Sequence, residues 1–284
     1  MTIRYAFSGL ALVMMFAAAG CGSDDPVTPP VGGETRIDMQ FLVNSQFTYT
    51  RTTLDTTNQP VAGSQRQYII ELKGSGGTII GAYDDWYRRV GTDMGTLAKD
   101  TLFIRTSPGS KEGTSFTKDV MVYGFVHKLH TAFIDQIVAA IPGVSRPDIP
   151  GPQWDIIAQY HAQDGSEIAA GSSWTLGNAN GTQLNFTIPS FPTPITITVT
   201  TKGTLDARGV DMAVGSKTVK TWKSTVTATA DLFAQKTDVK VSFWFSDNPS
   251  GQIKVEQQGT KFIVPLVNIT FPLPGERQEL QSWK

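Results

Sequence analysis

The chain has 284 residues, of which 40% are hydrophobic and 17% charged, and its formal net charge is −1. This length suffices for one large domain or two small ones. Its Lys and Arg residues form no basic block, which argues against nucleic-acid binding, because that interaction needs clustered positive charge. Its single cysteine excludes an intramolecular disulfide, so the fold must rely on packing.

The first 20 residues have the parts of a secretory signal. Arg4 supplies a positive charge, Leu10–Phe16 form a short apolar run, and Ala18–Gly20 are the small residues that precede Cys21. The apolar run is much shorter than the roughly 20 residues that a membrane-spanning helix needs. We therefore expect a cleaved signal peptide at residues 1–20.

Cys21 and the small residues before it resemble the lipobox of bacterial lipoproteins, although Ala18 stands where that family usually has leucine. The resemblance implies that Cys21 is the lipid attachment site, carrying acyl chains such as palmitate. Several acyl chains hold a protein stably at a membrane, whereas one chain binds only marginally. The alternative is an ordinary secreted protein, cut after Ala19 or Gly20, with a free thiol.

Residues 22–35 are rich in Pro and Gly, which predicts a partly extended, partly flexible tether. Gly22 follows the cysteine, where aspartate would resemble an inner-membrane retention signal, so the outer membrane of the bacterial envelope is favoured. The expected organisation is a signal peptide at 1–20, the lipidated cysteine and tether at 21–35, and a single β-rich globular domain at 36–284.

Beyond the tether, short alternating runs of Thr, Val, Ile and aromatic residues predict an antiparallel β protein. In the first half the expected strands are Phe47–Arg51, Gln65–Leu72, Thr78–Val90, Thr101–Thr106 and Asp119–Phe125. In the second half, alternation is clearest at 195–200, 219–230 and 239–245. The turn at 246–251 and its return strand Gln252–Glu256 predict a hairpin, and Phe262–Phe271 and Gln278–Trp283 are expected to complete the sheet.

One segment, starting at Val126, has helical spacing. Apolar residues recur at Leu129, Phe133, Ile137 and Ala140, and Pro142-Gly143 should end the helix. Gln153–His161 fits either a second short helix or a strand. We therefore predict a mainly β fold with a small helical insertion around 127–162. Its sheet is either a curved antiparallel half-barrel or a β-sandwich.

The runs Val241–Ser246, Gly251–Glu256 and Glu279–Trp283 look like the C-terminal part of uncharacterised β-rich envelope lipoproteins. Those proteins are similar in layout to the carrier and receptor proteins of outer-membrane lipoprotein sorting, which are half-barrels with a hydrophobic concavity. The resemblance is one of layout, and it carries over no catalytic residue.

Motifs for catalysis are missing. His127 and His130 have a spacing at which a helix can present both to one metal, but no His-Glu-x-x-His motif accompanies them, and His161 lies elsewhere. The sequence also lacks a Gly-x-Ser-x-Gly motif and the ligand spacing of a calcium-binding EF-hand. We therefore predict no catalytic residues, no metal and no cofactor.

The densest polar and aromatic cluster is Asp84–Arg89. Because Trp, Tyr and Arg are favoured anchors of interfaces, Trp86, Tyr87 and Arg88 are candidate recognition residues. The alternative is a strand with ordinary cross-strand pairs. Tryptophan residues elsewhere are candidates either for lining a ligand cavity or for the core, namely Trp154, Trp174, Trp222, Trp244 and Trp283.

Together these features favour a non-enzymatic envelope lipoprotein. Its expected partners are the membrane, through the lipidated N-terminus, and either a hydrophobic ligand such as a lipid or an envelope protein, with no nucleic acid. A structural or assembly accessory of the envelope is the alternative, and a hydrolase is a remote one.

Overall fold

The structure, a computed structural model, describes residues 36–188, 193–232, 235–264 and 269–284. The predicted signal peptide, Cys21 and the tether to residue 35 lie outside the described residues. The described elements, in chain order, are β1 (Gln46–Leu54), β2 (Arg66–Gly74), β3 (Tyr87–Asp93), β4 (Lys99–Lys111), β5 (Thr114–Tyr123), α1 (Phe125–Ala140), β6 (Trp154–Gln159), β7 (Ser173–Leu176), β8 (Thr182–Phe186), β9 (Ile195–Val214), β10 (Lys217–Leu232), β11 (Gln235–Asp247), β12 (Ser250–Gln257), β13 (Thr260–Val264), β14 (Ile269–Leu273) and β15 (Gly275–Trp283).

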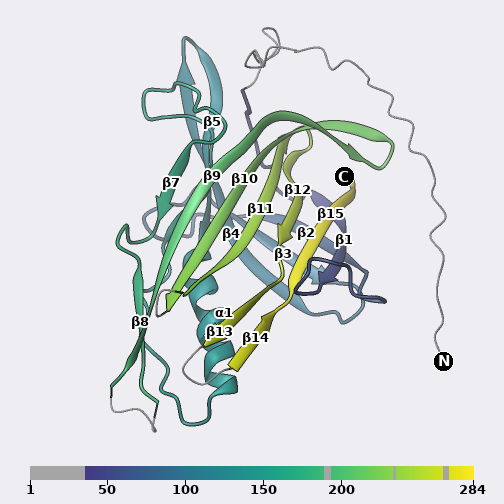
Figure 1. Cartoon of the computed structure of the whole chain (residues 1–284). Helices are drawn as coiled ribbons and strands as arrows, with labels where there is room; N and C mark the ends of the chain where they lie inside the picture. The colour runs from purple at the N-terminus through teal and green to yellow at the C-terminus, as the bar shows by residue number, and fades with distance from the viewer. Residues whose placement is uncertain (1–35, 189–192, 233–234, 265–268) are drawn as a thin grey trace, which may run out of the picture. The chain divides into compact units, whose positions relative to one another are not determined.

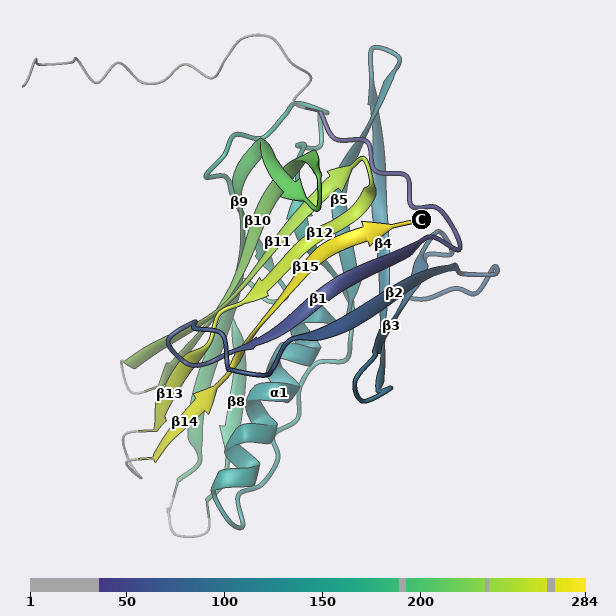
Figure 2. The same cartoon turned by 90° about the vertical axis from the view of Figure 1, so that its right-hand side faces the viewer.

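The main sheet has 13 strands in the order β6-β5-β4-β3-β2-β1-β15-β12-β11-β10-β9-β7, with β8 also paired to β9. Two antiparallel meanders meet in its centre, where β1 pairs with β15 (Figures 1 and 2). The mainly β, antiparallel fold expected from the alternating sequence is confirmed.

The alternation in the sequence has the expected physical cause. Ile195, Ile197 and Val199 on β9 are buried, whereas Thr196 between them is exposed. Successive side chains of a strand point to opposite faces, so one face of β9 packs in the interior while the other meets solvent. The hairpin β11–β12 also forms where its turn residues predict it.

Helix α1 packs against the inner face of the sheet (Figure 2). Its first turn is held by β6, because a carboxylate oxygen of Asp155 accepts the backbone N–H of Val126 at 2.9 Å. At the other end, Ile141 takes an extended conformation, and the helix stops just before Pro142. Among the described residues, no helix is both long enough and apolar enough to cross a membrane.

Contacts of α1 show that the sheet is curved. The ring of Phe125 lies 5.7 Å from that of Phe243 on β11. Nζ of Lys128, one turn along the helix, donates to the carbonyl oxygen of Thr101 on β4 at 3.2 Å. Since five strands separate β4 from β11 in the sheet, one helix reaches both only if the sheet bends around it. The curved-sheet alternative is therefore favoured over a sandwich.

Side chains cover the free edge of β6. The indole N–H of Trp174 on β7 donates to the carbonyl oxygen of Ile156 at 2.7 Å. The hydroxyl of Ser224 on β10 donates to the backbone carbonyl oxygen of Ile157 at 3.0 Å. An exposed strand edge is a template for unwanted pairing. Here side chains from β7 and β10, near the other end of the sheet, donate hydrogen bonds to two backbone carbonyls of β6 without adding a strand.

Two expected elements differ in the first half of the chain. The strand predicted at Thr78–Val90 begins only at Tyr87, because Gly76, Gly77, Gly81 and Ala82 all take positive φ and build turns. The helical insertion expected at 127–162 ends at Ala140, and Trp154–Gln159 is a strand paired with β5. A third difference lies in Phe262–Phe271, whose described residues form a separate two-stranded sheet, β13–β14, rather than joining the main one.

Candidate functional site

The concave side of the sheet is filled with side chains. One hydrophobic cluster joins β1, β2 and β5 to β9–β12 and includes Trp222 and Phe245, which are almost fully buried. A second cluster joins Ile134 and Ile137 of α1 to β8–β10 and to the β13–β14 hairpin. The space that would hold a hydrophobic ligand in a half-barrel is therefore occupied by α1 and by the core.

The other tryptophans serve separate parts of the fold. Trp154 donates its indole N–H to the carbonyl oxygen of Ile80, and Trp174 caps β6 as described. Trp244 lies beneath the amines of two lysines, and Trp283 beneath one. They are spread over packing, capping and surface positions, and do not converge on one cavity.

The three predicted recognition residues lie in different environments. Trp86 is only 6% exposed; its indole N–H donates to the carbonyl oxygen of Thr78 at 2.9 Å. Tyr87 is half-buried and its ring packs on Phe41. Arg88 is exposed. A partner can therefore reach Arg88 directly, whereas Trp86 holds the turn before β3 in place.

The histidines do not gather into a metal site. His127 and His130 both line a cavity of about 290 Å³ beside the 150–153 loop. Burial lowers the pKa of His130, as does the nearby His127. His161 instead packs on Phe116. No group of three His, Cys, Asp or Glu side chains able to hold a metal occurs in the described part of the chain.

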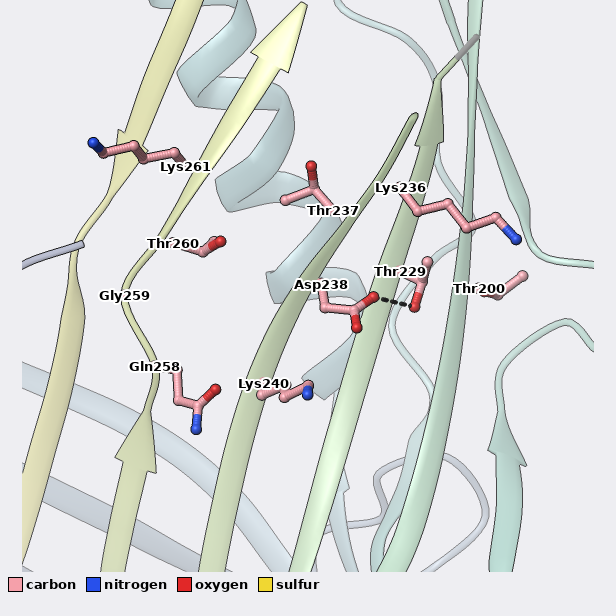
Figure 3. Close-up of a pocket in the computed structure, with 10 residues that line it drawn as sticks. All are labelled: Thr200, Thr229, Lys236, Thr237, Asp238, Lys240, Gln258, Gly259, Thr260 and Lys261. Atoms are coloured by element: carbon pink, nitrogen blue, oxygen red, sulfur yellow. Dashed lines mark hydrogen bonds between the residues drawn. The ribbon is translucent and has the colours of Figure 1, made fainter. Parts of the chain in front are cut away.

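A larger cleft opens where the sheet splays (Figure 3). Strand β11 pairs with β10 along Gln235–Phe245, but its pairing with β12 reaches only to Val241. After Gln257, the last residue of β12, the chain continues into β13, which pairs with β14 and not with β11. On this side the N–H of Gln258 still donates to the carbonyl oxygen of Lys240 at 2.9 Å, and no described strand pairs with residues 235–239.

This β11–β13 cleft has a volume of about 650 Å³ and is lined by Thr200, Thr229, Lys236, Thr237, Asp238, Lys240, Gln258, Gly259, Thr260 and Lys261 (Figure 3). The lining thus contains three lysines and one carboxylate. Lys236 and Lys240 extend on the side of Asp238, whereas Lys261 points away from it (Figure 3). Oδ1 of Asp238 already accepts the hydroxyl of Thr229 at 2.7 Å. The lining is cationic and rich in hydroxyl groups, which suits an anionic, hydrogen-bonding ligand.

Gly259 fixes one wall of the cleft. Its N–H donates to the side-chain oxygen of Asn58 at 2.7 Å, and a Cβ at this position would lie 2.0 Å from the carbonyl oxygen of Asp55. Only glycine allows the loop after β1 to approach the link between β12 and β13 so closely. On the inner side, Phe262 of β13 packs its ring on Phe133 of α1 at 4.7 Å.

No pattern in the sequence predicts this cleft. Lys236, Lys240 and Lys261 look like ordinary solvent-facing residues of alternating strands, and exposed lysines commonly protect strand edges. The three lysines line one cleft only because β13 leaves the main sheet and pairs with β14.

Comparisons with known proteins assign no family to this chain. No protein-family model and no curated protein matches the chain. A crystal structure of a "putative lipoprotein" from Parabacteroides distasonis shares 9% identity over 88% of this chain and 99% of its own, with a TM-score of 0.41. A "putative exported protein with YmcC-like fold" from Bacteroides fragilis shares 8% identity over the same fractions, with a TM-score of 0.38. Likeness at this level carries no functional assignment. The structure itself defines a protein with an open, curved, antiparallel sheet around one helix.

Proposed function

We propose that this chain is a lipid-anchored, non-enzymatic protein of the bacterial envelope, held at the outer membrane through Cys21, that binds an extended acidic segment of an envelope protein. The lipobox-like sequence at residues 18–21 supports the anchor. The β11–β13 cleft supports the binding function and is the observation that carries it.

Two properties of the cleft favour this ligand. Lys236, Lys240 and Lys261 line the cleft with Asp238 as the one carboxylate of the lining, and Nζ of Lys236 also lies 3.9 Å from a carboxylate oxygen of Asp231. The lining keeps an excess of positive charge, and electrostatic complementarity steers and orients a partner. The segment 235–239 of β11, beyond the hydrogen bond from Gln258 to Lys240, also presents a backbone edge with which no described strand pairs. An extended peptide uses such an edge for main-chain hydrogen bonds, with its side chains giving specificity.

A hydrophobic ligand is a weaker candidate. The concave face is packed with α1 and two hydrophobic clusters, so a lipid would bind there only after α1 leaves the sheet. That displacement would expose Ile134 and Ile137, and burying each such side chain contributes about 1.5–3 kcal/mol.

Site-specific photo-crosslinking in the native host tests the proposal. A photoreactive residue at Thr237, inside the cleft, should give a discrete crosslinked envelope protein, and one at the exposed Thr218 of β10 should not. Replacing Lys236 and Lys240 by Glu should abolish the crosslink at Thr237, whereas Lys99→Glu on β4 should leave it intact. Equal crosslinking at the two threonines, no crosslink at either, or survival of the product in the double variant would overturn the proposal.

A further inference from the structure

The cavity of about 290 Å³ beside the first turns of α1 has walls of its own. It lies where the helix meets the loop 150–153 and the turn that follows β7. The N–H of Gly124 donates to the carbonyl oxygen of Gln153 at 2.6 Å, and Nδ1 of His127 lies 2.8 Å from the carbonyl oxygen of Pro150. These two contacts fix the loop against the helix. The volume is close to the lower end of the range for small-molecule sites, about 300–1,000 Å³.

His130 on α1 is the most deeply buried polar side chain of the lining. It is 4% exposed, its Nε2 is enclosed, and neither ring nitrogen has a hydrogen-bond partner among the described residues. A buried polar group without a partner costs free energy. Because no hydrogen bond fixes the ring, a half-turn about χ2 exchanges its nitrogen and carbon positions. The ring edge that lines the cavity can therefore present a nitrogen to a bound molecule.

The two histidines offer uncharged hydrogen-bonding groups. Burial lowers the pKa of His130, and the nearby His127 lowers it further, so His130 is neutral at pH 7 and has one donor and one acceptor nitrogen. The carbonyl oxygen of Pro150 can only accept, so Nδ1 of His127 donates to it. Nε2 of His127 is then left for another partner.

The rest of the lining is also uncharged. Its other polar side chains are the amides and hydroxyl of Gln153, Asn178 and Thr182, and it includes no Lys, Arg, Asp or Glu. The carboxylate of Asp155 binds the N–H of Val126 and is not part of the lining. A charged ligand would find no counter-charge in this lining, and burying an unpaired charge is costly. An apolar ligand would leave His130 unpaired. Amides, imidazoles and hydroxyls both donate and accept, as do the hydroxyl groups of a ligand.

We infer that this cavity binds a neutral, polyhydroxylated molecule of about the size of one sugar ring, with one hydroxyl on His130 at the floor and others on His127 and Gln153. Gln153 and Asn178 are exposed, so the ligand enters past these amides. Gly177 stands across the entrance, where a Cβ would lie 3.7 Å from Cγ1 of Val126 and 3.9 Å from Nε2 of Gln153 and would narrow it. The cavity shares no residue with the β11–β13 cleft and does not depend on the function proposed for it.

Titration of isotope-labelled protein, followed by NMR through the imidazole resonances of His130, tests the inference. The probes are D-glucose, D-galactose and D-mannose, and the control ligand is D-glucuronate, which carries a carboxylate on the same kind of ring. At least one neutral sugar should shift the His130 resonances saturably, and glucuronate should bind about tenfold more weakly or not at all. Thr182→Val should weaken sugar binding several-fold, whereas Thr218→Val on β10, which is exposed, should leave it unchanged.

His130→Leu separates binding from packing. Leucine nearly matches the volume of the imidazole and has no polar group to leave unpaired, so this variant should lose sugar binding, measured by saturation transfer, and keep the Tm of the wild type. Where it fails to fold, Thr182→Val still decides. Absence of binding by all three sugars, equal binding of glucuronate, or unchanged binding in Thr182→Val or His130→Leu would overturn the inference.

Methyl glycosides distinguish two sources of the ligand. A sugar can reach the cavity as a free monosaccharide or as the terminal unit of a glycan chain. Binding of the methyl glycoside as tight as that of the free sugar assigns the cavity to a glycan terminus, because the methyl group stands where the chain would continue. Binding of the free sugar alone assigns it to a monosaccharide.

Discussion

Replacing Gly91 by alanine should destabilise the protein through a single overlap on the inner face of β3. Gly91 does not have positive φ, so the backbone accepts alanine there without strain. The new Cβ, however, would lie 1.7 Å from the hydroxyl oxygen of Tyr68, 2.3 Å from its Cζ and 2.4 Å from a carboxylate oxygen of Asp100. The Tyr68 ring is buried and has to move away from Asp100.

The magnitude follows from two contributions. Overpacking a core costs about 1–3 kcal/mol, and losing a hydrogen bond to a charged group costs about 1.5–3 kcal/mol. Together they predict a loss of roughly 2.5–6 kcal/mol. At about 2–4 °C per kcal/mol for a domain of this size, Tm should fall by roughly 5–24 °C.

Urea and thermal unfolding followed by circular dichroism measure the effect. Gly151→Ala is the matched control, because a Cβ at that position meets nothing within 4 Å, and it should change Tm little. Tyr68→Phe in the Gly91→Ala background should recover part of the loss, since it removes the nearest clashing atom. A Gly91→Ala protein as stable as wild type would refute the reasoning.

Three further variants probe other parts of the molecule. Cys21→Ser should release the protein from membranes and remove acyl chains detected by mass spectrometry; membrane retention would contradict the anchor. Burial raises the pKa of Asp119 to about 6, so the folded state binds the extra proton and stability should fall as pH rises from about 4 to 7. Asp119→Asn should flatten this pH dependence in urea unfolding by about 2–3 kcal/mol, and parallel wild-type and variant curves would count against it. Ser224→Ala should cost about 1–3 kcal/mol, because it leaves the carbonyl of Ile157 unpaired, whereas exposed Thr218→Ala should cost almost nothing in the same unfolding assay.

Local patterns predicted those elements whose burial alternates cleanly. The hairpin from Val239 to Glu256 and the helix from Val126 were visible because one face of each is apolar and a turn signal bounds it. The strand expected at Thr78–Val90 failed because Ile79 and Ile80 look strand-like, whereas the glycines around them build turns, and Ile79 is 71% exposed.

The candidate cleft could not be predicted from sequence for a different reason. Lys236 and Lys261 line one cleft only because β13 pairs with β14 and leaves the main sheet. Arg89 likewise looks like any charged strand residue, yet it is buried and donates to the side-chain oxygen of Gln278, far away in the chain. Both properties depend on which distant segments come together in the fold, and residue spacing does not encode this.

The way the chain enters the sheet has a mechanical consequence. Ile37, Met39 and Phe41 are buried in the main cluster, and the carbonyl oxygen of Ile37 accepts the N–H of Thr117 on β5. The chain then crosses to β1, which lies between β2 and β15. A pull on the chain ahead of Arg36 therefore loads β5, the neighbour of the edge strand β6, first. It has to extract three buried side chains before it reaches β1, a strand paired on both sides, so this entry segment would shield the centre of the sheet from tension that arrives along the chain.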